Sequence, residues 1–435
     1  MNFITEELTE QAIMVGVRLG PETHQLLSVE DSLQELEMLA ETAGIEVVGS
    51  VTQSLNRPNS RTYIGKGKLE ELKLLAEELN AKVILFDDEL SPRHQRELEK
   101  EFPGDYKVLD RTALILDIFA QHADTREGML QVELAQYKYR LPRLTRAWTH
   151  LARQAGGAAG RSGSVGGVGL RGPGETQLEV DRRDISKRID KLEEELEKVR
   201  GHRTRHRSQR RKSNIPVVAL VGYTNAGKST LLNALTDAQI YVADQLFATL
   251  DPTTRQLELP TGETVLMTDT VGFIQKLPTD LVAAFRATLE EIAEADLLLH
   301  LIDGSHENAQ SQRQTVLETL EEIGAGEIPI LNVYNKIDLL DEESLQELKD
   351  GADPLSLYIS AREKWGFEEL SAAISAGVAQ GYERVSVLLP YAEGRLVSMF
   401  HEKGHVRSLE HKENGVRIQG LLPVQLLAFF ENYLD

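Results

Sequence analysis

The stretch of sequence that decides the fold reads Val217-Val-Ala-Leu-Val-Gly222-Tyr-Thr-Asn-Ala-Gly227-Lys228-Ser229. Its apolar start predicts a buried strand and a helical pattern follows Ser229, which is the setting that a phosphate-binding P-loop requires. The glycines let backbone N–H groups turn toward a β-phosphate, Lys228 neutralises β- and γ-phosphate oxygens, and Ser229 is placed to bind Mg²⁺. The loop residues expected to contact a nucleotide are Gly222, Tyr223, Thr224, Asn225, Ala226, Gly227, Lys228 and Ser229.

A second motif follows the strand that we expect at residues 264–268. It reads Asp269-Thr270-Val271-Gly272. At this place an aspartate reaches Mg²⁺ through a water molecule, and the N–H of Gly272 meets the γ-phosphate. Alone the pattern is common and typical of a turn.

A third motif, Asn335-Lys336-Ile337-Asp338, follows another predicted strand and selects the base. The carboxylate of Asp338 can accept two hydrogen bonds from the N1–H and N2 amino groups of guanine, and adenine presents no such pair of donors there. Ser360-Ala361-Arg362 stands after the next strand and completes the set. The sequence therefore predicts a GTP and GDP site with Mg²⁺.

The first switch of such a site is expected in the segment Phe247-Ala248-Thr249-Leu250-Asp251-Pro-Thr253-Thr254-Arg255. A threonine here would bind Mg²⁺ and the γ-phosphate while GTP is present and let go after hydrolysis. Thr249, Thr253 and Thr254 are all candidates, and the residues alone do not choose among them.

Phe273 stands after Gly272, where Ras-like GTPases carry a glutamine that orients the attacking water. A phenyl ring cannot polarise water, so intrinsic hydrolysis is expected to be slow. The missing group would come from a partner, from another residue or from a bound ion. The alternative is that another polar side chain of this chain does the work alone.

Composition limits the class of protein. The 435 residues predict about two to four domains, and no apolar run approaches the roughly 18 residues of a membrane span. The chain has no cysteine, which excludes disulfides and thiolate metal sites. The start of the chain is acidic and lacks the basic region of a secretory signal. We expect a cytoplasmic protein.

The net charge of −21 is unevenly distributed along the chain. Residues 134–174 hold no acid, and their basic residues are Lys138, Arg140, Arg143, Arg146, Arg153, Arg161 and Arg171. A second run, Arg200 to Lys212, contains seven lysines and arginines and again no acid. Such runs indicate nucleic acid or an anionic membrane surface, although a solvated helix face is the simpler alternative.

Patterning divides the chain into four expected parts: an α/β domain at 1–130, a helical hairpin at 131–212, a doubly wound, mostly parallel GTPase domain at 213–381 and a small α+β domain at 382–435. The hairpin joins a long helical pattern from Thr112 to Gln154 with a second helix around Ile185 to Val199. Its tip is the glycine-rich loop 156–174, interpreted as an RNA probe or as a disordered linker. A weaker signal is the glycine and lysine loop Arg61 to Lys68, which is a structural turn or an anion site at a helix N-terminus.

The chain resembles the HflX family of translation-linked GTPases along nearly all of its length. The resemblance rests on Gly222 to Ser229, on Phe247 to Asp251, on Asp269 to Phe273, and on Gly172-Pro-Gly-Glu-Thr-Gln-Leu-Glu179, which separates HflX from the Obg and Era families. It implies that Thr249 is the switch ligand of Mg²⁺. It further implies binding to the large ribosomal subunit, insertion of the glycine-rich loop near the peptidyl transferase centre, and splitting of stalled ribosomes.

Two functions of different class follow as hypotheses. The first is a GTPase with Lys228, Thr249 and Gly272 as its catalytic residues, whose hydrolysis is stimulated on the large ribosomal subunit. The second is an RNA-binding or RNA-remodelling switch in which hydrolysis is slow and regulatory. In both, the expected RNA contacts are Arg153, Arg161, Arg171, Arg203 and Arg207. A third hypothesis is a peripheral membrane GTPase held by the basic helix. We expect a monomer.

Overall fold

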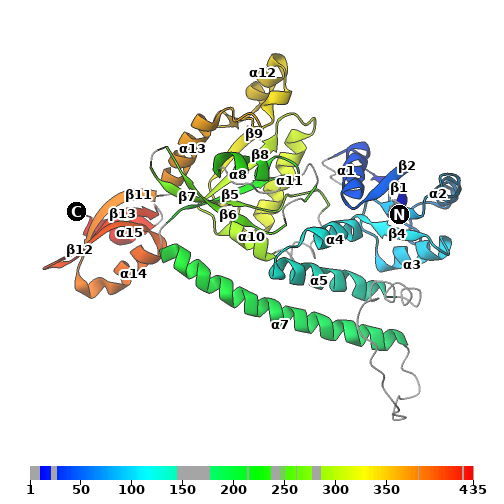
Figure 1. Cartoon of the computed structure of the whole chain (residues 1–435), viewed down its shortest axis with the longest axis horizontal. Helices are drawn as coiled ribbons and strands as arrows, with labels where there is room; N and C mark the ends of the chain where they lie inside the picture. Colours follow the sequence, from blue (N-terminus) through cyan, green and yellow to red (C-terminus); the bar gives the residue numbers. More distant parts are fainter. Residues whose placement is uncertain are drawn as a thin grey trace, which may run out of the picture. The chain divides into compact units, whose positions relative to one another are not determined.

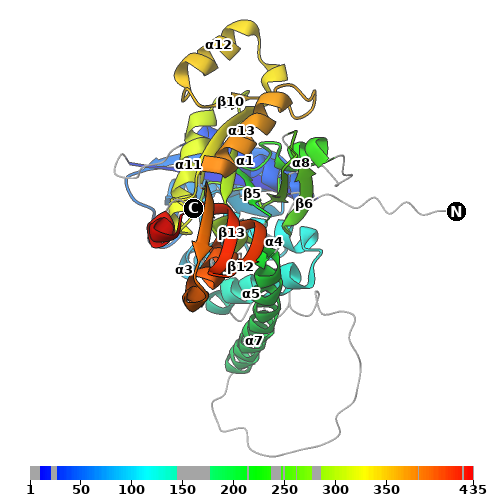
Figure 2. The same cartoon turned by 90° about the vertical axis from the view of Figure 1, so that its left-hand side faces the viewer.

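The computed structural model describes residues 10–20, 27–144, 177–212, 215–236, 246–247, 250–260, 262–276, 286–380, 382–423 and 426–434. Contacts divide them into two compact units, one up to Glu197 and the other from Lys198 onward. Figures 1 and 2 show the chain from two sides. None of the described helices is both long and apolar enough to span a membrane. The four-part division of the sequence stays a prediction.

The first unit begins with a parallel sheet in the order β2-β1-β3-β4. Its strands are β1 (Glu10–Leu19), β2 (Ile45–Leu55), β3 (Val83–Phe86) and β4 (Lys107–Asp110), and its helices are α1 (Val29–Thr42), α2 (Lys66–Glu78) and α3 (Pro92–Glu101). Ile13, Leu72 and Phe86 are fully buried in its core. Apolar runs such as Val83–Phe86 form strands because both faces of a parallel sheet are covered. The predicted α/β organisation is confirmed.

The helical pattern that follows is interrupted, contrary to the prediction of one long helix from Thr112. The structure has α4 (Arg111–His122), α5 (Arg126–Arg140) and a 3₁₀ turn η1 (Leu141–Arg143). Ala123 is extended, and the side chain of Thr125 accepts a hydrogen bond from the N–H of Gly128, which caps α5. This N-cap satisfies a backbone donor that a continuous helix would bond internally. Residues 145–154 of the predicted helix lie outside the described residues.

Helix α7 (Gln177–Lys212) pairs with α5. The guanidinium of Arg188 contacts the carboxylate of Glu133 at 2.7 Å, and Arg126 contacts Glu195 at 3.7 Å. Leu192 of α7 is fully buried. The glycine-rich loop 156–174 that would join them lies outside the described residues.

The second unit contains a six-stranded sheet in the order β10-β9-β8-β5-β7-β6. Its strands are β5 (Val217–Gly222), β6 (Thr253–Glu258), β7 (Thr264–Asp269), β8 (Leu297–Asp303), β9 (Ile330–Asn335) and β10 (Leu357–Tyr358), and its helices are α8 (Lys228–Thr236), α10 (Arg286–Ala293), α11 (Ala309–Glu322), α12 (Glu342–Gly351) and α13 (Phe367–Gln380). All neighbouring strands are parallel except β6 and β7. The predicted doubly wound P-loop fold is confirmed.

Helices cover both faces of this sheet (Figure 1). Leu301 shares a core with residues of α8 and α13, whereas its neighbour Ile302 packs with Ala309 of α11. Successive side chains of a strand point to opposite faces, so the two sets of helices lie on opposite sides. Strand β6 was not predicted, because Thr-Thr-Arg-Gln-Leu-Glu has no apolar run and forms an edge strand that pairs on one side only.

The chain ends in an antiparallel sheet of order β11-β13-β12, formed by β11 (Tyr382–Leu389), β12 (His405–Lys412) and β13 (Gly415–Pro423) with α14 (Gly394–Lys403) and α15 (Leu427–Phe430). Lys412 pairs with Gly415, the first residue of β13, so Glu413 and Asn414 form the two-residue turn between β12 and β13. Phe400 and Phe430 meet edge to face in its core, with ring centres 5.6 Å apart. This is the small α+β unit expected from the sequence.

Candidate functional site

The P-loop connects the carboxyl end of β5 with the start of α8, and both of its glycines are sterically required. A Cβ atom on Gly222 would lie 2.3 Å from the carbonyl oxygen of Leu301. Gly227 has φ +95°, and a Cβ atom there would lie 2.3 Å from Nδ2 of Asn335. A side chain at either position would displace the loop from the sheet, so the two glycines are needed for its shape.

Lys228 is the buried cation of this loop. Its side chain is almost completely enclosed, and its Nζ donates hydrogen bonds to the carbonyl oxygens of Gly222 at 3.1 Å and Tyr223 at 2.9 Å. Burial lowers the pKa of Lys228 to about 8, and the nearby carboxylate of Asp269 acts in the opposite direction. The ammonium is therefore held inside the loop.

Ser229 and Asp269 come together from two different elements. Oγ of Ser229 donates to Oδ2 of Asp269 at 2.6 Å, and Asp269 is fully buried at the end of β7. A hydroxyl and a carboxylate are hard oxygen ligands, and Mg²⁺ in nucleotide sites is held by one or two such groups together with phosphates and water. The pair fits this ion. The described residues contain no cluster of three or more His, Cys, Asp or Glu that could hold a metal by itself.

The segment after Asp269 is hydrogen-bonded along the P-loop. The N–H of Thr224 donates to the carbonyl oxygen of Phe273 at 2.8 Å, and the N–H of Phe273 donates to the carbonyl oxygen of Gly222 at 3.1 Å. The N–H of Gln275 donates to the Tyr223 hydroxyl at 2.9 Å. A sequence pattern does not predict these bonds, because they join loops about fifty residues apart.

Gly272 and Phe273 lie at the centre of this pairing. A Cβ atom on Gly272 would lie 2.9 Å from Cα of Thr224 and 3.1 Å from Nζ of Lys228, so only glycine fits against the loop. The phenyl ring of Phe273 is 1% exposed. It lies in the protein interior and offers no polar group to water. Thr270 is also buried, and its hydroxyl donates to the carbonyl oxygen of Leu220 at 2.6 Å.

One side chain links the three motifs on the base side of the site. Nδ2 of Asn335 donates to the carbonyl oxygen of Ala226 at 2.9 Å, and its Oδ1 accepts from the N–H of Ala361 at 2.9 Å. The P-loop, the Asn335 motif and the Ser360 motif therefore meet at one residue. A buried amide with both ends bonded has one orientation, which makes Asn335 a rigid strut.

The remaining residues of the base side lie on short turns. Lys336 has φ +64°, and Asp338 is half-buried in the 3₁₀ turn η3 (Ile337–Leu339). Oγ of the buried Ser360 accepts a hydrogen bond from the N–H of Glu363 at 3.0 Å. The Arg362 side chain is 81% exposed. The four predicted sequence motifs thus converge at the carboxyl edge of the sheet, where open α/β folds bind ligands.

The switch segment is described only in part. Ala248 and Thr249 lie outside the described residues, whereas Phe247 and Leu250 are buried and Asp251 is half-buried. Thr253 and Thr254 are strand residues of β6, and Oγ1 of Thr254 lies 3.0 Å from Oγ1 of Thr268. The Thr254 hydroxyl is therefore part of the sheet contacts between β6 and β7.

None of the five arginines expected to contact RNA has a described side chain. Arg153, Arg161 and Arg171 lie outside the described residues, and Arg203 and Arg207 lie on α7 with side chains that are not described. Lys138 contacts Glu193 of α7 at 2.7 Å.

Arg143 belongs to the first basic run of the sequence, but in the structure it is buried and does not face a partner. Its side chain is 5% exposed, and its Nη2 donates to the carbonyl oxygen of Leu90 at 2.7 Å and contacts Glu89 at 3.2 Å. It also stacks on the ring of Tyr139. Arg143 is thus an internal cation of the first unit and not a surface charge.

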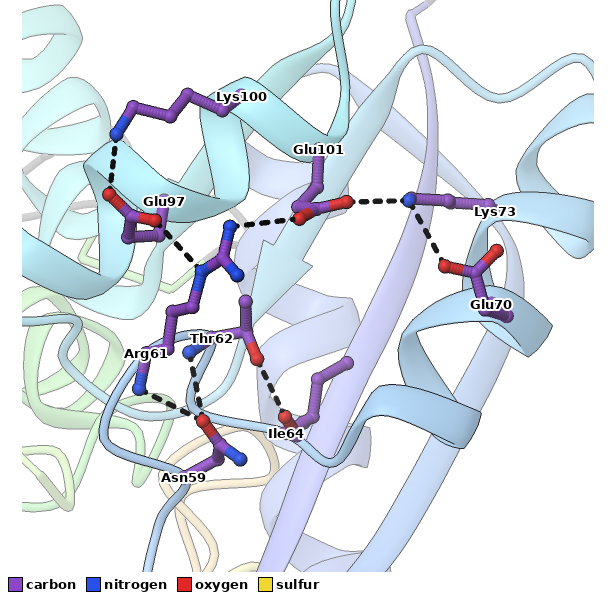
Figure 3. Close-up of polar contacts among 9 residues, drawn as sticks. All are labelled: Asn59, Arg61, Thr62, Ile64, Glu70, Lys73, Glu97, Lys100 and Glu101. Carbon is purple, nitrogen blue, oxygen red and sulfur yellow. Dashed lines mark hydrogen bonds and ion pairs between the residues drawn. The ribbon is translucent and has the colours of Figure 1, made fainter.

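The loop Arg61 to Lys68 is a compact turn (Figure 3). Oδ1 of Asn59 accepts hydrogen bonds from the N–H groups of Arg61 and Thr62, at 2.9 and 3.3 Å. The guanidinium of Arg61 contacts Glu97 at 2.9 Å and Glu101 at 3.5 Å on α3. Its charge is therefore met by carboxylates, which agrees with the structural interpretation of this loop.

Comparison with known proteins assigns the chain to well-populated families. Family models match residues 30–120 as a GTP-binding GTPase N-terminal region, 122–210 as a GTP-binding GTPase middle region and 217–336 as a 50S ribosome-binding GTPase. The relative named GTPase HflX from Caldanaerobacter subterraneus subsp. tengcongensis is 48% identical over 425 residues, which cover 98% of this chain and 94% of the relative. The GTPase HflX of Escherichia coli K12 is 44% identical over 418 residues, 95% of this chain and 94% of the relative.

Among solved structures, a GTP-binding protein from the hyperthermophilic archaeon Sulfolobus solfataricus in complex with GDP is 26% identical. The match covers 86% of this chain and 99% of that protein, with a TM-score of 0.41.

Proposed function

Since the chain belongs to the HflX family of GTPases, we propose that its GTP-bound form binds the large ribosomal subunit and promotes the dissociation of ribosomes. Hydrolysis of GTP, stimulated on the subunit, then releases the protein. The chain is a GTP hydrolase by its family and its P-loop domain. The ribosomal partner is supported by the description of the family model that matches residues 217–336. A cytoplasmic monomer follows as the simplest form for this role.

The observation that carries the proposal is the buried ring of Phe273. The backbone of Phe273 bonds to the P-loop on both sides, so that its side chain points into the core at the place where a water-orienting group is needed. An enzyme that lacks this group hydrolyses slowly until the group is supplied. A partner that completes the site couples hydrolysis to its own presence, which is the behaviour of a switch.

The proposed roles follow from the positions of the side chains. Lys228 neutralises the charge of the β- and γ-phosphates, and Ser229 with Asp269, through water, would hold Mg²⁺, which supplies further neutralisation of the phosphates when bound. The N–H of Gly272 donates to the γ-phosphate. Thr249 is the proposed switch ligand of the ion, by resemblance to the family. Asp338 recognises guanine.

A turnover assay tests the ribosomal partner. We expect GTP hydrolysis by the full chain to rise by at least about tenfold when large ribosomal subunits are added, because electrostatic groups supplied in trans raise such rates by several orders of magnitude. Small subunits alone serve as the control. Co-sedimentation with large subunits should be stronger in a non-hydrolysable GTP analogue than in GDP. Equal turnover with and without large subunits would count against the proposal.

The second function, an RNA-binding or RNA-remodelling switch, is favoured by the basic residues of 134–174 and 200–212 in an acidic chain. In this case the arginines bind phosphates, and their removal changes the dependence of affinity on salt. Replacing Arg161 and Arg171 with alanine should weaken binding to ribosomal RNA and lower the slope of log affinity against log salt by about one to two units, since each phosphate contact contributes nearly one.

The internal cation Arg143 cannot serve as a matched surface control, but the exposed Arg140 on α5 can. Arg140→Gln removes one charge from the same basic run outside the loop. If the slope stays unchanged in the Arg161 and Arg171 variants, the glycine-rich loop is not the part that binds RNA. If subunits stimulate turnover while RNA binding is unaffected, the first function stands alone.

A further inference from the structure

A carboxylate outside the four nucleotide motifs contacts the motif that selects the base. Asp303 is the last residue of β8, and its Oδ2 lies 2.7 Å from Nζ of Lys336. Its other oxygen, Oδ1, accepts hydrogen bonds from the N–H of Ser305 at 3.1 Å and from the Ser305 hydroxyl at 2.6 Å. The two oxygens are thus divided between the turn that follows β8 and the lysine.

The turn that contains Asp303 also contacts the backbone of the base-selecting motif. The N–H of Gly304 donates to the carbonyl oxygen of Asn335 at 2.9 Å. A Cβ atom on Gly304 would lie 3.2 Å from that same oxygen and 3.1 Å from Cδ2 of Leu348 on α12, so the turn is packed from both sides. Asp303 consequently holds a defined position relative to Asn335 and Lys336.

Lys336 needs such support because its backbone is left-handed, with φ +64°. A residue with a Cβ atom in this region is strained and stays there only when the surrounding contacts determine it. Lys336 lies between the rigid strut Asn335 and the turn that carries Asp338. A change in its conformation therefore changes the direction in which Asp338 points.

We infer that Asp303 is a positioning residue of the guanine site, which acts through the ammonium of Lys336 to hold the left-handed turn that presents Asp338 to the base. The Lys336 side chain is 27% exposed and the Asp303 side chain 12%, so the pair is only partly screened by solvent. Ser305 keeps the carboxylate in place through its opposite oxygen. The inference rests on the guanine role proposed above for Asp338, and it concerns nucleotide affinity and not the ribosomal partner.

The experiment compares Asp303→Asn, Lys336→Met and the double variant in the full chain. Asn keeps the shape of the side chain and loses its charge. Release of fluorescent GDP from Asp303→Asn should be about tenfold faster, on the scale of one charged hydrogen bond. KM for GTP should rise by a similar factor while kcat stays within about twofold, since the phosphate side is untouched. GTP and GDP should weaken equally, because the base is common to both.

The double variant decides whether Asp303 acts through Lys336. If it does, release from the double variant is no faster than from Lys336→Met alone, because the second change removes an interaction already lost. Additive effects of the two changes would overturn the inference, as would unchanged release from Asp303→Asn. Glu307→Gln, an exposed carboxylate on the same turn, is the charge control and should release GDP at the normal rate.

Two further measurements separate failure of the inference from misfolding of Asp303→Asn and from a wrong guanine assignment. Ser305→Ala loosens the same carboxylate without changing charge and should shift release in the same direction by a smaller factor, which covers the case in which Asp303→Asn does not fold. Failure of Ser305→Ala to accelerate release would then overturn the inference. Base preference of Asp338→Asn is measured in parallel, because an unchanged preference there refutes the guanine assignment itself, whatever Asp303 does.

Discussion

Replacing Lys228 with alanine is expected to abolish measurable GTP turnover and to lower kcat/KM by at least about 10³-fold, the scale of removing a preorganised electrostatic group. The ammonium is enclosed in the loop and its two hydrogen bonds go to backbone carbonyl oxygens of residues 222 and 223. Phosphate charge would then be met by backbone N–H groups and Mg²⁺ alone. Nucleotide affinity by titration and turnover by phosphate release both measure the effect.

Lys349→Ala is the control for this variant, because Lys349 lies on α12 of the same unit, away from the loop. It should keep normal affinity and turnover. Retention of GTP affinity within about twofold by Lys228→Ala would refute the assignment of the P-loop as the phosphate site. Circular dichroism and the unfolding midpoint show whether both variants are folded, because Lys228→Ala removes the cation beside the buried carboxylate of Asp269.

Asp338→Asn is expected to lower affinity for GTP by about 100-fold and to raise affinity for xanthosine triphosphate. In the proposed role the carboxylate accepts two bonds from guanine, a pair whose loss costs about 1–3 kcal/mol. An amide in its place turns an N–H donor toward the N–H donors of guanine, which adds repulsion to the loss. Xanthine carries an oxygen where guanine carries its amino group, so it can accept from the amide. Competition of both nucleotides against fluorescent GDP measures the change.

Glu343→Gln on α12 is a matched control, because it neutralises an exposed carboxylate five residues away. It should leave the preference for guanine unaltered. An Asp338→Asn variant that still prefers GTP to xanthosine triphosphate by the same factor would contradict the role of Asp338, and the base would have to be selected by other groups.

Much of the fold was predictable because its signals are local. The apolar run Val217 to Val221 ends in a glycine that only a sharp turn requires, and the neighbouring residues Asn414 and Gly415 mark the tight hairpin between β12 and β13. The break between α4 and α5 and the polar edge strand β6 were missed. Their signals are weak, since a capping threonine and an alternating polar segment also occur in helices and loops.

For the nucleotide site, the sequence determined its type and place, and the tertiary structure decided the contacts within it. The order and spacing of the motifs determined a guanine-nucleotide site and a P-loop fold, because each motif stands at the end of a strand and parallel strands end at one edge. Only the folded chain decided that Asn335 bonds to both Ala226 and Ala361, that Phe273 is bonded along the P-loop, and that Arg143 is an internal cation. These contacts join residues 26 to 109 positions apart or turn a charge inward. Such contacts depend on how loops pack, and no local pattern of residues encodes that packing.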